Sequence, residues 1–122
     1  MSKKKTLLIV DDSWVTRRFL TKLICNHFET DIVEAIDGID ALAKIEKKVP
    51  DCLLLDLLMP NKNGEEVLLD LKSKSIELPI IIISADIQDT TMQNCLDLGV
   101  YCFINKPPDK TELINVLRDI LE

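Results

Sequence analysis

Five side chains that could do chemistry stand where apolar segments of the sequence end. They are two adjacent carboxylates, a third carboxylate, a hydroxyl and an amine: Asp11, Asp12, Asp56, Ser84 and Lys106. If the preceding segments are parallel strands, all these side chains lie at the carboxyl edge of one sheet. In open α/β sheets, ligands bind at that edge.

These groups suit phosphoryl transfer. Three crowded carboxylates repel one another, and a divalent cation relieves the repulsion. Oxygen ligands suit Mg²⁺, which binds through one or two carboxylates and bridges to phosphate. One carboxylate can then act as a nucleophile, while an amine and a hydroxyl take up the remaining charge. Each group alone is weak evidence. Their occurrence together, each at the end of a predicted strand, strongly indicates this chemistry.

The apolar segments are predicted to form five short strands. Leu53–Leu55 and Ile80–Ile83 are continuous apolar runs, which are typical of strands buried on both faces. The other strands are expected at Thr6–Val10, Asp31–Ala35 and Tyr101–Asn105. Charged residues flank Asp31–Ala35, which places it near an edge of the sheet.

The first helix is expected to start after its cap, Ser13, and to run to about Phe28. Four of its side chains are predicted to face the core: Val15, Phe19, Leu23 and Ile24. Four others are predicted to face water: Arg17, Arg18, Thr21 and Lys22.

The other four helices are bounded by turn residues and proline: Asp37-Gly38, Pro50, Gly64, Gly99 and Asp109. Strands that alternate with helices form a parallel sheet, because each right-handed crossover places a helix on one of its faces. The sequence therefore predicts an α/β fold. No linker or repeat interrupts residues 1–122, so a single domain is expected.

Composition narrows the class of protein. With 122 residues, 47% of them hydrophobic, the chain can bury a core, and its net charge of −6 argues against direct binding to nucleic acid. No apolar stretch is long enough to span a membrane or to act as a signal peptide. The cysteines lack metal-site spacing and are predicted to be buried or half-buried thiols of a cytoplasmic protein: Cys25, Cys52, Cys95 and Cys102.

From about Lys5 to Leu121, the sequence resembles the receiver domains of two-component response regulators, most closely the single-domain chemotaxis type. The resemblance rests on these motifs: Val10-Asp11-Asp12-Ser13 with Arg17, Asp56-Leu-Leu-Met59-Pro60, Gly64, Ser84-Ala85, Gly99 and Lys106-Pro107. It implies a flavodoxin-like, doubly wound, five-stranded sheet in the order 2-1-3-4-5 with five helices.

The resemblance also implies a role for each site residue. Asp56 would accept a phosphoryl group from a sensor histidine kinase or a histidine phosphotransfer protein. Asp12, Asp56 and the backbone carbonyl of Leu58 would bind Mg²⁺, or Mn²⁺, directly. Asp11 would bind the cation through water, and Lys106 would pair with the phosphoryl oxygens. The domain would catalyse only its own phosphorylation and dephosphorylation.

A conformational switch is implied as well. Phosphorylation adds charge and acceptor oxygens at Asp56. Ser84 would move to bond one of these oxygens, and Phe103 would turn into the vacated space. The surface of the fourth helix, fifth strand and fifth helix would then bind a downstream protein. The Lys106–Pro107 bond would be cis and would aim the lysine inward.

Some positions depart from the family pattern. Many members have tyrosine where this chain has Phe103, so any hydroxyl contact with a partner is absent. The switch role of Phe103 is favoured, but it could also be a core residue, and Tyr101 could serve the surface instead. Leu58 and Asp86 would flank the phosphoryl group and are expected to influence its lifetime.

Three other functions fit the sequence less well. A docking module that takes no phosphate would be signalled by loss of an acidic residue or of Lys106, but all are present. A small-molecule phosphatase would need a second aspartate where Leu58 stands. A flavin or nucleotide binder is disfavoured because Asp11-Asp12-Ser13 is acidic and lacks glycine. If the chain is complete, its output must be contact with a protein. The sequence would equally suit a receiver from a longer protein.

Overall fold

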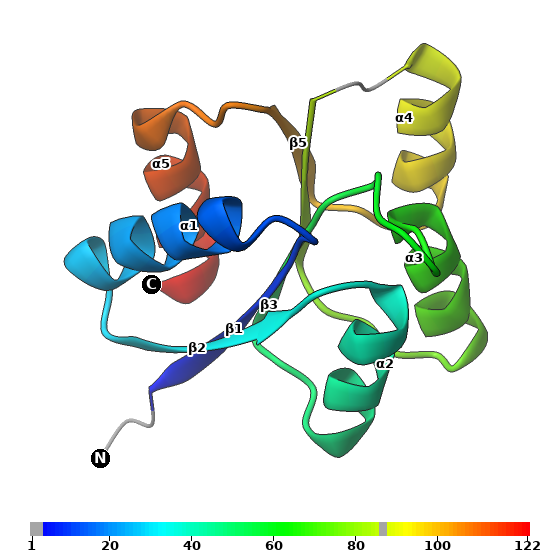
Figure 1. Cartoon of the computed structure of the whole chain (residues 1–122), viewed down its shortest axis with the longest axis horizontal. Coiled ribbons are helices and arrows are strands. Elements are labelled where there is room, and N and C mark those ends of the chain that lie inside the picture. The colour runs from blue at the N-terminus through cyan, green and yellow to red at the C-terminus, as the bar shows by residue number, and fades with distance from the viewer. Residues whose placement is uncertain (1–3, 86–87) are drawn as a thin grey trace.

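The computed structural model describes residues 4–85 and 88–122 of the chain. Within these residues, five strands alternate with five helices (Figure 1). The strands are β1 (Lys5–Val10), β2 (Thr30–Ala35), β3 (Cys52–Leu55), β4 (Ile80–Ser84) and β5 (Cys102–Asn105). The helices are α1 (Trp14–His27), α2 (Gly38–Lys47), α3 (Gly64–Ser73), α4 (Asp89–Asp97) and α5 (Lys110–Leu121).

All strands pair in parallel in the order β2-β1-β3-β4-β5, which confirms the predicted topology and the position of β2 at an edge. The register brings the ends of β1 and β3 level, because Val10 pairs with Leu55. The residues that follow these two strands therefore start from neighbouring positions. At the other edge, Ser84 of β4 pairs with Asn105 of β5.

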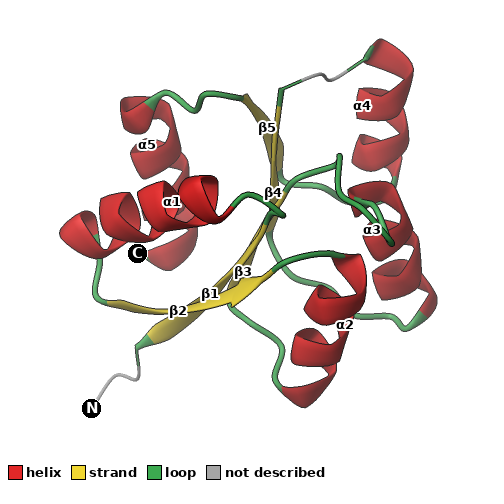
Figure 2. Ribbon diagram, viewed as in Figure 1, coloured by secondary structure: helices red, strands yellow, loops and turns green. Residues whose placement is uncertain are grey.

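Helices cover both faces of the sheet, with α1 and α5 on one side and α2, α3 and α4 on the other (Figure 2). Successive strand residues point to opposite faces. Leu7, Ile9 and Leu54 thus join the hydrophobic cluster under α1 and α5. Leu53 and Leu55 join the cluster under the other three helices. The central strands are buried on both faces, as their unbroken apolar sequences predict.

Side-chain caps set the start of four helices. Each capping residue accepts a hydrogen bond from the backbone N–H three residues later: Ser13, Asp37, Asn63 and Asp109. Such a cap contributes about 1 kcal/mol to helix stability. At the start of α3, a Cβ on Gly64 would lie 2.6 Å from the Asp56 carbonyl oxygen. Glycine therefore allows α3 to begin close against the end of β3.

The predicted inner face of α1 is partly wrong. Val15 is 69% exposed and Phe19 is 38% exposed, whereas Leu20 and Arg17 are buried. Positions 17, 20 and 24 form one helical stripe, which faces the sheet. Arg17 can be buried there because its guanidinium finds polar partners. Thr21, expected in water, is only partly exposed.

The cysteines are all free thiols. Cys52 and Cys95 are buried and Cys102 is half-buried, as predicted, but Cys25 is exposed on α1. The prediction for Cys25 was wrong because it lies on the solvent side of the helix, next to the buried Ile24. In the described part of the chain, no helix has the length and apolar character needed to cross a membrane.

Candidate functional site

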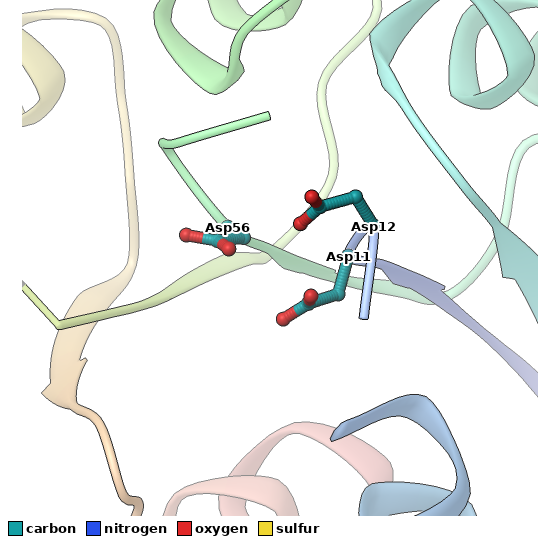
Figure 3. A group of neighbouring side chains, drawn as sticks. All are labelled: Asp11, Asp12 and Asp56. Atoms are coloured by element: carbon teal, nitrogen blue, oxygen red, sulfur yellow. The ribbon is translucent and has the colours of Figure 1, made fainter. Parts of the chain in front are cut away.

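Three carboxylates from two strand ends converge at the carboxyl edge of the sheet. Asp11 and Asp12 follow β1, and Asp56 follows β3 (Figure 3). One oxygen from each carboxylate lies within 4.8 Å of the others. Asp11 and Asp56 are buried, while Asp12 is exposed. The level register of β1 and β3 thus assembles the acidic cluster.

Asp56 is held at both its backbone and its side chain. Its N–H donates to the Val10 carbonyl at 3.0 Å, which continues the pairing of the two strands. Its Oδ1 accepts a hydrogen bond from the Leu58 N–H at 3.2 Å. Its Oδ2 accepts one from Lys106 Nζ at 2.9 Å. The carboxylate is therefore fixed at the end of β3 with only 6% of the residue exposed.

Lys106 supplies a positive charge between two of the carboxylates. Its Nζ lies 2.7 Å from Asp11 Oδ2 and 2.9 Å from Asp56 Oδ2. Burial lowers the pKa of Lys106, but the hydrogen bonds to Asp11 and Asp56 outweigh it, so the pKa is raised above its ordinary value. The Lys106–Pro107 peptide bond is cis, the isomer expected from the sequence.

Ser84 ends β4 as a completely buried residue. Its Oγ has no hydrogen-bond partner among residues 4–85 and 88–122. Its carbonyl accepts the Lys106 N–H at 3.0 Å, so the hydroxyl-bearing residue and the lysine are directly linked through the backbone. A buried hydroxyl without a partner is costly, and such a group is suited to bond an oxygen that arrives later.

The structure describes three other residues singled out from the sequence: Leu58, Phe103 and Tyr101. Leu58 is 62% exposed beside Asp56. Phe103 is partly buried against the core under α2, α3 and α4, whereas Tyr101 is 51% exposed. Asp86, expected to flank the phosphoryl group, lies outside the described residues.

An arginine and a glutamate behind the acidic cluster connect α1 with β2. Arg17 Nη1 donates to the Asp11 carbonyl at 2.7 Å, and Nε donates to Glu34 Oε1 at 2.9 Å. Arg17 appeared in the sequence motif without a role, and Glu34 was not singled out. The spacing of Arg17 from Leu20 and Ile24 is a sequence signal for a buried position, but an arginine is assigned to the surface by type.

A second set of contacts joins the β2–α2 loop to the β3–α3 loop. Asn61 Nδ2 donates to Asp37 Oδ2 at 2.8 Å, and the Gly38 N–H donates to the Lys62 carbonyl at 3.0 Å. A Cβ on Gly38 would lie 2.5 Å from that carbonyl oxygen, so the close approach requires glycine. These contacts hold the loop that follows Asp56 against the start of α2.

Trp14 is an exposed aromatic residue close in sequence to the acidic pair. It is the first residue of α1, two positions after Asp12, and it is 63% exposed. The guanidinium carbon of Arg18 lies 5.6 Å from the ring centroid.

The residues present fit a hard divalent cation. The convergent donors are carboxylate oxygens, with no thiol or imidazole among the three clustered side chains. Such oxygen donors favour Mg²⁺ over softer metals. The cation would neutralise carboxylates that Lys106 alone balances only in part.

The sequence of the chain is similar to those of known proteins. The family model of the response regulator receiver domain matches residues 7–118. A protein-glutamate methylesterase/protein-glutamine glutaminase of Clostridium acetobutylicum is 36% identical over 124 residues, which cover 98% of this chain and 36% of the relative. The chain thus spans about a third of the length of the methylesterases it matches.

Solved structures agree with this match. The phosphorylated cyanobacterial phytochrome response regulator RcpA is 27% identical, has a TM-score of 0.81, and is matched over 97% of this chain and 91% of its own. A response regulator receiver protein from Pseudomonas putida has a TM-score of 0.91 at 24% identity, with 98% and 99% of the two chains covered. This second likeness supports the fold alone.

Proposed function

Because the chain belongs to the response regulator receiver family of two-component systems, we propose that Asp56 is its phosphoacceptor and that Asp11 and Asp12 help to hold Mg²⁺ there. We also propose that residues 1–122 act as a single receiver domain. The observation that carries the proposal is the convergence of the three carboxylates with Lys106, which already contacts Asp56.

The residues have complementary tasks in the proposed reaction. An Asp56 carboxylate oxygen forms the new bond to phosphorus as the bond between phosphorus and the donor's leaving group breaks. Asp12 and the Leu58 carbonyl would hold Mg²⁺ directly, and Asp11 would hold it through water. When bound, the cation would supply positive charge to the phosphoryl oxygens. Lys106 pairs with a phosphoryl oxygen once it is released from Asp56.

Ser84 and Phe103 would couple the modification to the surface. The buried Ser84 hydroxyl, which lacks a partner in the described residues, would bond a phosphoryl oxygen and draw the end of β4 toward Asp56. Phe103, one strand away, would then move further inward. The altered surface of α4, β5 and α5 would bind a downstream protein.

The proposed partners follow from this chemistry. The phosphoryl donor would be a histidine of a sensor kinase or of a histidine phosphotransfer protein. The domain would act on no separate substrate and would catalyse only its own phosphorylation and dephosphorylation. The known modification of RcpA supports the proposal, since that relative was solved in phosphorylated form.

Intact-mass spectrometry after incubation with Mg²⁺ and a small-molecule phosphodonor tests the proposal. We expect one phosphoryl adduct in the wild type and in Asp119→Asn, which alters an exposed aspartate of α5. The adduct should be absent from Asp56→Asn and from samples that contain a chelator. Stoichiometric labelling of Asp56→Asn would refute the site. Binding of Mg²⁺ without any adduct would instead favour a docking module that works without phosphate.

A further inference from the structure

Arg17 is a buried charged residue that the proposed reaction does not use. It is 9% exposed and lies on the face of α1 that packs against the sheet. Its guanidinium donates to the Asp11 carbonyl at 2.7 Å and to Glu34 Oε1 at 2.9 Å. One side chain therefore links α1, the end of β1 and the edge strand β2.

The carbonyl that Arg17 binds belongs to the peptide between the two clustered aspartates. On the other side, the Asp11 N–H donates to the Ala35 carbonyl at 3.2 Å. The backbone of Asp11 is thus held at both its donor and its acceptor. Because Asp12 is exposed, its backbone rather than side-chain packing determines where its carboxylate lies.

We propose that Arg17, oriented by Glu34, is a positioning residue that fixes the Asp11–Asp12 peptide so that both carboxylates face Asp56. This inference rests on the proposed function, since it assigns the orientation of the residues that would hold the cation. Groups behind the ligands commonly set ligand geometry, and their loss typically weakens metal binding by 10- to 100-fold.

Positioning and simple electrostatics predict opposite results for loss of Arg17. The guanidinium is a positive charge close to an acidic cluster, so its removal by itself should strengthen the binding of a cation. If Arg17 instead orients the aspartates, its removal should weaken cation binding despite the gain in negative charge. The sign of the change therefore distinguishes the two roles.

Calorimetric titration with Mg²⁺ provides the test, with urea unfolding to confirm that each variant is folded. We expect Arg17→Ala to raise the dissociation constant for Mg²⁺ about tenfold. Glu34→Gln should give a smaller increase, because Arg17 keeps its bond to the Asp11 carbonyl. Arg17→Lys should be intermediate, since an ammonium lacks the fork that spans both partners.

Arg18→Ala is the matched control, because it removes the same charge from the neighbouring, exposed position of α1. It should leave Mg²⁺ affinity unchanged or slightly increased. Unchanged or tighter binding by Arg17→Ala would overturn the inference. If Arg17→Ala does not fold, wild-type affinity in folded Glu34→Gln and Arg17→Lys would overturn it equally. A wild type that binds no Mg²⁺ would overturn the proposed function as well.

Discussion

At the scale of single residues, Lys106 occupies the position of an internal counter-ion. Its Nζ contacts both Asp11 and Asp56, and these contacts raise its pKa. A cation that enters the cluster meets this positive charge at close range. Lys106 would thus both hold the carboxylates together and compete with the metal they are expected to bind.

Replacement of Lys106 by alanine separates these effects. We expect Lys106→Ala to bind Mg²⁺ at least about fivefold more tightly, because removing a like charge about 4 Å away changes the binding free energy by about 1 kcal/mol even at the dielectric constant of bulk water. The proposed phosphorylation-dependent change at the surface of α4, β5 and α5 should be lost. Calorimetry and backbone NMR measure the two effects, with the exposed Lys22→Ala as control. Normal switching of Lys106→Ala would contradict the assigned role.

At the scale of elements, two loops at the carboxyl edge are joined into one unit. Asp37 caps α2 and also accepts the hydrogen bond from Asn61, which has φ of 67° in the β3–α3 loop. Asparagine tolerates this left-handed conformation better than most residues. The loop that carries Leu58 away from Asp56 is therefore fastened to a neighbouring helix start.

The contact between Asp37 and Asn61 is expected to depend on pH. Hydrogen bonds from the Asp40 N–H and the Asn61 side chain lower the pKa of Asp37 below the ordinary aspartate value of 3.8. Ionised Asp37 therefore stabilises the folded state at pH values above its ordinary pKa. This stabilisation is lost as the pH falls through the lowered pKa of the folded state. We expect Asp37→Asn to reduce the free energy of unfolding more at pH 6 than at pH 2.5. Urea unfolding without metal measures the difference.

The comparison for this prediction is Asp119→Asn, which changes an exposed aspartate. Its free energy of unfolding should differ from that of the wild type by a similar small amount at both pH values. If Asp37→Asn were equally destabilised at both, the ionised form of Asp37 would not be the stabilising species.

The sequence predicted these elements well because strong local signals mark them. Unbroken apolar runs identify β3 and β4, and capping residues identify the starts of α1, α2 and α5. The rotation of α1 was not predicted, because an arginine is assigned to the surface by type unless its partner is known. That partner, Glu34, lies 17 residues away on β2. The Asp37–Asn61 bond spans 24 residues and was missed for the same reason.

At the scale of the whole molecule, the reactivity of buried thiols measures how well the hydrophobic clusters on the two faces of the sheet exclude solvent. Burial raises the pKa of Cys52 to about 12 and that of Cys95 to about 11. Cys52 lies in the central strand β3, and Cys95 lies on the buried face of α4. Cys25 on α1 is exposed. Since thiolates are the reactive form, these sites should differ widely in reactivity.

Alkylation of the native protein at pH 8, followed by peptide mass spectrometry, checks this ranking. We expect Cys25 to react first, and Cys52 and Cys95 to react only when the surrounding structure opens. Cys25→Ser should remove the fast phase and leave the slow ones unchanged. Modification of Cys52 at the rate of Cys25 would contradict a sheet that is closed on both faces.

The location of Trp14 has a practical consequence. It is the only tryptophan of the chain, and it begins α1 two positions after Asp12, with the Arg18 guanidinium over its ring. Tryptophan emission from this protein therefore originates at a single position, close in sequence to the acidic pair. Cation binding or acyl-phosphate formation should change the intensity of that emission. The kinetics of the site can then be followed in stopped flow with no attached dye.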